Sequence, residues 1–366
     1  MGYILCKSTK NKCYLPKIRH KVVILHNKKA FASGILIDMN LKFLFNSGKN
    51  PKWKYFLKCY CRSLVPNSYY RRRLQKVLED AKKRDDYDYI QQRADYYCKL
   101  TDNKDMQKGS YHAIGDMKMC RQKVYYYDSM EYLRWFDPKL KMSLLPGDIN
   151  YVPESPQILK SRPIGDDNAN SVLLNLNKVR HFIFIDDKVP FAEKKNMAIF
   201  RGKIGLPERG GCKMQRWHLL KKFWGHPLMD LGEIASGHGD HTEEWLTPKL
   251  TIYQQLEYKF VFSIEGNDVA SNLKWIMSSN SIAVMPKPTC ETWFMEGTLI
   301  PNYHYIEVKP DYSDLIDRLN YYTEHTDEAE AIIRHAHEYV EQFRDAERED
   351  IISLMTLKKY LEICND

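Results

Sequence analysis

The stretch KFVFSIEGNDVASNLKWIMSSNSIAVMPK, residues 259–287, decides the fold class. It holds two apolar runs, 259–264 and 281–285, each of the length and composition of a buried strand. A glycine-containing turn and a segment that we expect to be helical, 271–279, separate them. This order predicts a βαβ unit of a parallel sheet. Because ligands bind outside the carboxyl ends of the strands in such sheets, Glu265 and Gly266 are candidates for ligand contacts.

The start of the predicted helix is a candidate phosphate site. Ser271 and Asn272 are residue types that begin helices well, and the unpaired N–H groups at a helix start attract anions. Lys274 would add a full positive charge. The stretch contains only one glycine and therefore lacks the GxGxxG fingerprint, so an ordinary βαβ unit without a phosphate remains the alternative.

Outward from this stretch, short strands alternate with helices along most of the chain. This alternation predicts an α/β architecture with parallel sheets. Residues 1–50 permit no firm assignment, since Lys21–His26 and Ile35–Phe45 suit either strands or short helices. The further segments expected as strands are 181–185 (HFIFI), 196–200 and 303–308, and those expected as helices are 69–100, 217–223 and 313–366.

A second constellation is IFRGKIGLPERGGCKMQR, residues 199–216. A strand leads into Arg201 and Gly202, and a loop with three further glycines and Arg209 follows. Glycines let a backbone approach a ligand closely, and arginine binds phosphate through paired hydrogen bonds. The loop therefore suits a diphosphate, and a flexible basic surface loop is the alternative.

A third candidate is Asp148 in LLPGDINYVPESP, residues 144–156. It follows Pro-Gly directly after an apolar run, which predicts a position at a strand end facing a cleft. An aspartate in this position is more often a turn residue or a helix cap.

Metal-binding and nucleophilic motifs are weak. The pairs Asp166-Asp167 and Asp186-Asp187 are more typical of solvated loops than of a metal site, and His238, Asp240 and His241 lack further ligands at a recognised spacing. Cys212 and Cys290 have no nucleophile signature, and no kinase or Walker motif is present. We therefore expect neither a metal nor a cofactor.

Length and composition suit two globular domains, because the chain has 366 residues, of which 43% are hydrophobic. No apolar run reaches the roughly 18 residues that span a bilayer, and residues 33–45 are interrupted by Asp38, Asn40 and Lys42. Nine cysteines without a CxxC pair favour free thiols in a reducing cytoplasm. The first residues lack a signal-peptide core, and Cys6 replaces the Ser or Thr of a myristoylation signal, so we expect neither a secreted nor an integral membrane protein.

Charge is distributed unevenly. Residues 1–84 hold 21 Lys and Arg against three acidic residues, whereas the remaining residues carry a net charge of −9. Aromatic residues alternate with the basic ones, most clearly in the run before and through Arg71, Arg72 and Arg73. Such a segment attracts nucleic acid or an anionic lipid surface, or it serves only solubility.

Three stretches in this order resemble glycosyltransferase family 90. They are Arg201-Gly202 with PERG (207–210), then YKFVFSIEGNDVASNLKW (258–275), then SNSIAVMPKP (279–288) leading to ETWF (291–294). SRPIGDDNANSVLLNLNKVRHF (161–182) is typical of the bacterial lipopolysaccharide-type branch. The resemblance covers about residues 120–355, with a weaker likeness at 69–74 and 91–100.

The resemblance implies a GT-B-like fold, in which two Rossmann-like domains face each other across a cleft and the C-terminal helices pack back on the first. On this basis we expect a basic segment at 1–50, an acceptor-side domain at 51–195, a nucleotide-sugar-binding domain at 196–340 and a returning helix at 341–366. The implied reaction is an inverting, metal-independent transfer from a nucleotide sugar, commonly a UDP-sugar.

The family's catalytic base matches Asp148, and its diphosphate contacts match Arg201, Gly202, Arg209 and Ser271, with Asn272 beside them. The eukaryotic members carry an arginine two residues after that serine, where this chain has Leu273 followed by Lys274. A carboxylate base suits a hydroxyl nucleophile, and cations suit a leaving diphosphate.

The expected partners are a nucleotide-sugar donor, a lipopolysaccharide-core or other surface-glycan acceptor, and an anionic membrane surface contacted by residues 50–75. The expected location is the inner face of the cytoplasmic membrane. A nucleic-acid-binding protein that uses the basic region is the alternative, although it would not explain the RG…PERG cluster. A nicotinamide-dependent enzyme is disfavoured, because its glycine fingerprint is missing.

Overall fold

The structure, a computed structural model, describes residues 47–235 and 241–366. The chain divides into two units after Ser47, and the description that follows concerns the second, Gly48–Asp366. The segments expected at 21–26 and 35–45, and the residues His238 and Asp240, lie outside the described residues.

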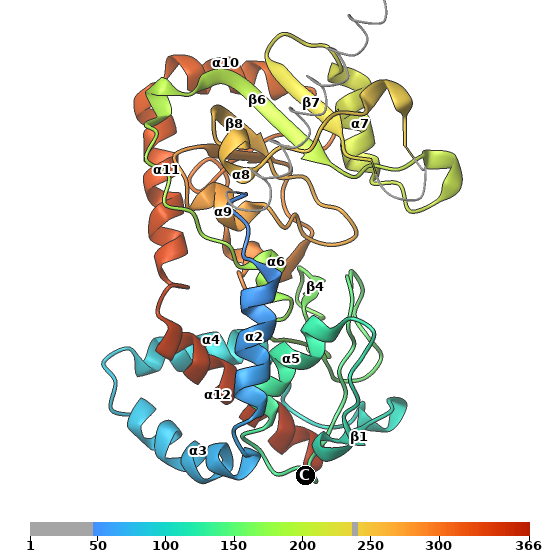
Figure 1. The fold of residues 1–366 in the computed structure, drawn as a ribbon, viewed down its shortest axis with the longest axis vertical. Helices are drawn as coiled ribbons and strands as arrows, with labels where there is room; N and C mark the ends of the chain where they lie inside the picture. The colour runs from blue at the N-terminus through green and yellow to red at the C-terminus, as the bar shows by residue number, and fades with distance from the viewer. Residues whose placement is uncertain (1–46, 236–240) are drawn as a thin grey trace, which may run out of the picture. The chain divides into compact units, whose positions relative to one another are not determined.

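The main sheet is parallel and has five strands in the order β11-β9-β8-β6-β7. All five residues of β8 are buried, so this strand runs through the centre of the sheet (Figure 1). The βαβ unit predicted from residues 259–287 is therefore confirmed. The strands are β6 (Lys195–Gly202), β7 (Met229–Glu233), β8 (Tyr258–Phe262), β9 (Ile282–Met285) and β11 (Ile306–Glu307).

Helices connect these strands and cover the sheet, as the α/β pattern requires. Phe200, Phe260 and Phe262 of the sheet share a buried cluster with Leu219 and Leu315 of the flanking helices. The helices of this half are α7 (Met214–Phe223), α8 (Ile252–Gln255), α9 (Leu273–Met277), α10 (Leu315–Glu324) and α11 (Thr326–Glu341).

The preceding half is largely helical, and its described strands pair only in two-stranded sheets. The strand pairs are β1 (His112–Ala113) with β2 (Lys141–Met142), β3 (Gln157–Leu159) with β5 (Ser171–Leu173), and β4 (Ser161–Pro163) with β10 (Cys290–Thr292). The helices are α2 (Lys52–Ser63), α3 (Asn67–Ala81), α4 (Tyr87–Tyr97), α5 (Lys123–Leu133) and α6 (Lys178–His181). None of the described helices has the length and apolar character needed to cross a membrane.

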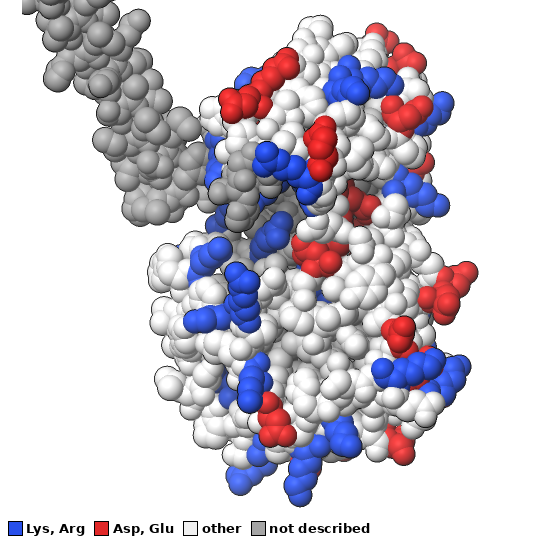
Figure 2. Space-filling view, turned by 90° about the vertical axis from the view of Figure 1, so that its right-hand side faces the viewer, with Lys and Arg blue, Asp and Glu red and all other residues white. Residues whose placement is uncertain are grey.

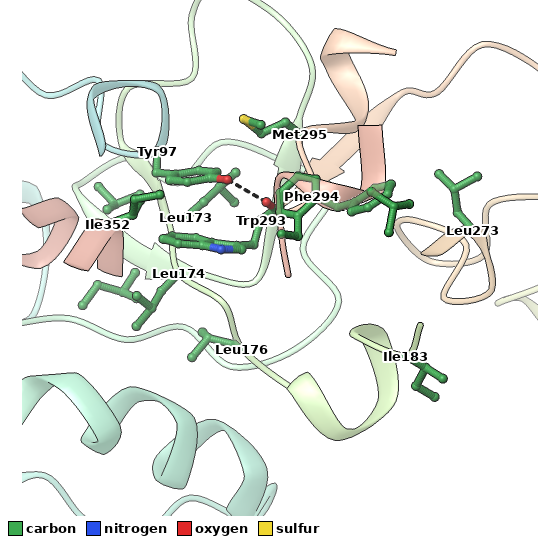
Figure 3. Packing of buried hydrophobic residues seen from close by; sticks show 14 of the residues in the cluster. Tyr97, Leu173, Leu174, Leu176, Ile183, Leu273, Trp293, Phe294, Met295 and Ile352 are labelled. Carbon is green, nitrogen blue, oxygen red and sulfur yellow. Dashed lines mark hydrogen bonds between the residues drawn. The ribbon is translucent and has the colours of Figure 1, made fainter. Parts of the chain in front are cut away.

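The last helix, α12 (Ala346–Asn365), returns to this half and packs along α4 and α5 (Figure 1). A buried aromatic stack joins the halves beside it (Figure 3). The rings of Tyr97 and Trp293 lie 3.8 Å apart, and the Tyr97 hydroxyl donates a hydrogen bond to the Trp293 carbonyl at 2.7 Å. Arg93 and Glu349 form a buried ion pair between α4 and α12. These contacts fix the strand β10 and the helix α12 to one core.

Several predicted elements differ from the observed ones. The helix expected at 69–100 is divided into α3 and α4, and the strand expected at 303–308 is shortened to the two residues of β11. The strand expected at 181–185 is absent, because this segment has no neighbouring strand to pair with, and Ile185 N–H donates to the Ser278 hydroxyl instead. Its alternating pattern reflects burial, since Ile183 and Ile185 lie in the core. The helix expected at 271–279 is confined to α9, which has five residues.

Candidate active site

The strand order places a crevice between β6 and β8. From β6 the chain continues first to β7 on one side and then to β8 on the other, so the direction of the connections reverses at this point. Ligands of open α/β sheets bind outside the carboxyl ends of the strands where this reversal occurs. The loops that follow β6 and β8, residues 203–213 and 263–272, meet there.

The loop after β6 has the backbone of a close-approach loop. Gly205, Gly210 and Gly211 all adopt positive φ angles, between 65° and 84°, which favour glycine. The carboxylate of Glu233, at the end of β7, accepts hydrogen bonds from Ile204 N–H and Gly205 N–H. The glycines are therefore needed for the shape of the loop, and Glu233 braces it.

Arg216 on α7 spans the two loops. Its guanidinium donates hydrogen bonds to the carbonyls of Lys203 and Ile264, one after each strand. A Cβ on Gly266 would lie 3.1 Å from this guanidinium, so the glycine allows the close approach. Among the described residues Arg216 has no carboxylate partner. Burial, followed by the charge of Arg180, lowers its pKa to about 10.

Asp148 faces these loops from the preceding half. Its Oδ2 accepts a hydrogen bond from the Asn267 side chain at 3.1 Å. The amide oxygen of Asn267 accepts in turn from the ammonium of Lys213, in the glycine-rich loop. One side chain from the loop after β8 thus joins the carboxylate to the loop after β6.

A buried lysine holds the other oxygen of Asp148. Lys160 lies 2.5 Å from Asp148 Oδ1 and 2.7 Å from Asp268 Oδ2, and its side chain is 1% exposed. Burial alone would raise the pKa of Asp148, but the hydrogen bond and charge of Lys160, with the hydrogen bond from Asn267, hold it below its ordinary value. Burial raises the pKa of Asp268. Asp148 is 28% exposed, so it is the carboxylate that a ligand can reach.

Cationic side chains gather on this face. Figure 2 shows Lys and Arg side chains around a hollow near the middle of the view, with Asp and Glu side chains beyond it. The charges of Lys160 and Arg180 both contribute to lowering the pKa of Asp148. The arrangement can hold a diphosphate opposite the partly exposed carboxylate of Asp148.

Arg201 lies at the carboxyl end of β6, but its guanidinium points away from the crevice. It forms an ion pair with Asp230 at 2.6 Å, near the beginning of β7. Asp230 also accepts a hydrogen bond from the hydroxyl of Tyr258, at the beginning of β8. The structure therefore does not bring the Arg201 guanidinium to Asp148. The guanidinium instead binds Asp230, near the beginning of β7.

Lys274 and Asn272 are also turned inward. Lys274 is fully buried and forms an ion pair with Glu296. Asn272 immediately precedes α9, but its side chain donates to the Phe262 carbonyl at 2.9 Å and caps no helix N–H. Ser271, in the turn before it, is partly exposed. Of the three residues expected at this helix start, Lys274 is buried, whereas Ser271 and Asn272 are each partly exposed.

Glu265 and Gly266 lie in the crevice loop. Glu265 accepts hydrogen bonds from the N–H groups of Thr289 and Cys290, which ties the loop after β8 to the segment after β9. Burial raises the pKa of Glu265. A pocket beside it is lined by residues that follow these two strands and by α7 and α9, among them Gln215, Ser263, Ala270, Lys287 and Glu296.

Gly202 is the last residue of β6, and Arg209, in the loop after this strand, is exposed. Arg71, Arg72 and Arg73 are exposed on α3. Within the described residues no group of three or more His, Cys, Asp or Glu side chains is arranged to hold a metal ion. Asp187 forms an ion pair with Lys194 and accepts a hydrogen bond from Asn280 N–H, and Asp186 forms an ion pair with Lys188.

Five residues of the site were not singled out from the sequence: Lys160, Lys213, Arg216, Asn267 and Asp268. Lys213 and Arg216 lie within the quoted glycine-rich stretch, and Asn267 and Asp268 directly follow Gly266. Their position between a strand and the next helix could have indicated their role. Nothing in the sequence indicates a role for Lys160, because this role depends on contacts with two distant segments.

Comparisons with known proteins identify the family of the chain. The model of glycosyl transferase family 90 matches residues 174–361. The O-glucosyltransferase LpsA of Dichelobacter nodosus is 40% identical over 241 residues, which cover 65% of this chain and 72% of that protein. The uncharacterized protein 035R of Invertebrate iridescent virus 3 is 28% identical over 101 residues, or 27% of this chain and 9% of that protein.

The chain belongs to glycosyltransferase family 90. It is therefore an enzyme that transfers a sugar, and the resemblance inferred from its motifs is confirmed.

Proposed function

We propose that this enzyme transfers a sugar, with inversion, from a UDP-sugar to a hydroxyl of a lipopolysaccharide-core or other surface-glycan acceptor. The observation that carries the proposal is the hydrogen bond between Asp148 and Asn267, which places one ionised carboxylate against the crevice at the carboxyl ends of β6 and β8. UDP-glucose is the first donor to test, because the similar protein LpsA is named an O-glucosyltransferase.

Asp148 acts as the general base in this proposal. A sugar hydroxyl is a poor nucleophile and must lose its proton as the new bond forms, so a carboxylate within hydrogen-bonding reach accelerates the step. A lowered pKa keeps Asp148 ionised and ready to accept that proton at neutral pH. Lys160 orients it, and the acceptor proton goes to the exposed part of the carboxylate.

The leaving diphosphate gains negative charge as the glycosidic bond breaks, and fixed cations stabilise that charge. We assign this role to Arg216 and Arg209, with Lys213 at the side of Asp148. The remaining proposed donor contacts are Gly202 at the end of β6 and Ser271, Glu265 and Gly266 in the loop after β8. The resemblance also suggested Arg201, Asn272 and Lys274. We assign these three a structural role, because their side chains bind other protein groups.

The proposed arrangement is GT-B-like, with residues 51–195 as the acceptor side, 196–340 as the donor side and 341–366 as the returning helix. The position of α12 against α4 supports it. The proposed place of action is the inner face of an anionic membrane, where a glycolipid acceptor is presented. No cofactor or metal is part of the proposal, since side-chain cations supply the charge.

A donor screen by calorimetry tests the proposal, with UDP-, GDP-, ADP- and CMP-sugars and three forms of the full chain. These are the wild type, Asp148→Asn, and Asp166→Asn as a matched control on an exposed loop. We expect one donor to bind all three forms with similar affinity. Turnover should fall about a hundredfold or more in Asp148→Asn alone. Full turnover in Asp148→Asn would reject the base, and the absence of any donor binding would reject the site.

A further inference from the structure

The helix α2 exposes a continuous apolar stripe. Trp53, Leu57, Tyr60 and Leu64 follow one another at helical spacing, and their exposed fractions are 65%, 55%, 52% and 84%. Residues at this spacing share one face of a helix. Single exposed apolar residues are common on proteins, but four in one line form a patch, and patches mark interaction sites.

The stripe is held outward by polar contacts on the other side of α2. The Tyr55 hydroxyl donates to Asp128 at 2.7 Å, and Arg62 forms an ion pair with Glu131 at 2.5 Å. Arg134 donates to the Arg62 carbonyl just beyond. These contacts fix the rotation of the helix, so its apolar face cannot turn toward the core.

The surroundings of the stripe are strongly basic. Residues 51–78 contain eight Lys and Arg and no Asp or Glu. Within the described part of the chain, Lys52, Lys58, Arg71, Arg72 and Lys76 have neither an ion pair nor a side-chain hydrogen bond. An apolar helix face rimmed by unpaired cations is the pattern of a helix that lies in the interface of an anionic membrane.

We propose that α2 and the first turns of α3 dock on an anionic lipid surface, with the stripe inserted among the acyl chains and the cations on the headgroups. Nucleic acid does not need the aliphatic side chains Leu57 and Leu64, which contribute nothing to phosphate or base-edge contacts. A second copy of the chain would place two surfaces of the same charge together.

The surface is linked to the candidate active site through α5. Asp128, which holds Tyr55 of α2, lies one turn from Tyr125, whose hydroxyl donates to the Gly147 carbonyl beside Asp148. The docked helix would thus hold the loop of Asp148 near the lipid. The use of this link to reach a membrane-borne acceptor rests on the proposed function, whereas the lipid contact itself does not.

The test is cosedimentation of the full chain with vesicles of phosphatidylcholine alone or mixed with phosphatidylglycerol. The stripe variant is Leu57→Ser with Leu64→Ser, and its control is Ile300→Ser, an apolar residue exposed elsewhere. The charge variant is Arg71→Glu with Arg72→Glu, and its control is Lys221→Glu with Lys222→Glu on α7. Circular dichroism and thermal melting confirm that each variant is folded.

We expect the wild type to bind only the anionic vesicles and to be released by high salt. Both the stripe variant and the charge variant should bind at least about tenfold more weakly, and both controls should bind normally. Equal binding to neutral vesicles, or unchanged binding by the stripe variant, would overturn the proposal. The proposal would also be overturned if the stripe variant still shifted DNA in a gel as the wild type does. A wild-type dimer that becomes a monomer in the stripe variant would overturn it as well. Donor calorimetry on the same variants separates the proposals, because donor binding should survive loss of the lipid contact.

Discussion

The ammonium of Lys160 lies 2.5 Å from Asp148 Oδ1, in a position that solvent barely reaches. The lysine comes from the end of the β3–β4 connection, and the aspartate from the loop that follows β2. Lys160 stays charged, because Asp268 and Asp148 outweigh the effect of burial and raise its pKa. The pair therefore sets the basicity of the carboxylate that we propose as the base.

Removal of Lys160 should shift the pH dependence of transfer. A general base works in its deprotonated form, and Lys160 lowers the pKa of Asp148 below its ordinary value, near 4. The wild type should therefore keep its kcat/KM as the pH falls from 7 to 5. In Lys160→Met, burial then dominates, the pKa of Asp148 rises, and the acid limb should move to higher pH.

The measurement is a profile of kcat/KM against pH for both forms, restricted to conditions in which thermal melting shows folded protein. Lys195→Met, an exposed lysine paired with Glu257, is the control. An acid limb at the same pH in Lys160→Met would show that Lys160 does not tune the base.

Arg216 and Arg201 should respond differently to substitution. Arg216→Met removes the cation that spans the crevice loops, so donor affinity should fall about tenfold or more. Arg201→Met instead removes the ion-pair partner of Asp230, and should lower the free energy of unfolding by about 1.5–3 kcal/mol with little change in donor affinity. Calorimetry and urea denaturation of both variants decide this, with Lys221→Ala on α7 as a control. A loss of donor affinity in Arg201→Met without a loss of stability would restore Arg201 to the site.

The contrast between these two arginines shows how far sequence reasoning reaches. The strands β6, β8 and β9 were predictable, because uninterrupted apolar runs bounded by turn residues specify buried strands locally. The segment 181–185 has the same local pattern but no partner strand, and pairing is a tertiary property. Arg201 sits in a phosphate-binding pattern, yet Asp230, 29 residues later, draws its guanidinium away. Side-chain direction at a strand end depends on such distant partners.

The ion pair of Lys274 with Glu296 should matter for stability. Both side chains are almost fully buried, so removing one partner leaves an uncompensated charge in the core. We expect Lys274→Met to lower the free energy of unfolding by about 3–5 kcal/mol. In the double variant Lys274→Met with Glu296→Gln no unpaired charge remains, and much of that loss should be recovered. Urea denaturation of the single and double variants measures the difference, and equal losses in both would contradict this account.

His181 should make the protein less stable at acid pH. Its side chain is 2% exposed, and neither ring nitrogen has a hydrogen-bond partner among the described residues. Burial, and then the charges of Lys160, Lys274 and Arg180, hold its pKa well below the ordinary value of 6.5. Above that value the ring is neutral in both the folded and unfolded states. Below pH 6.5 the imidazole binds a proton in the unfolded state but not in the folded state, so stability falls as the pH decreases.

The expected result is a melting temperature that falls between pH 7.5 and pH 5, and falls less in His181→Leu. Asp128 has the opposite tendency, because burial raises its pKa to about 6 and the folded state gains a proton in the same range. The comparison between wild type and variant removes that contribution, since Asp128 is present in both. His226→Leu, at a partly exposed position, is the control for loss of a histidine ring elsewhere in the protein. If the pH dependence of His181→Leu were the same as that of the wild type, the buried imidazole would have no part in acid destabilisation.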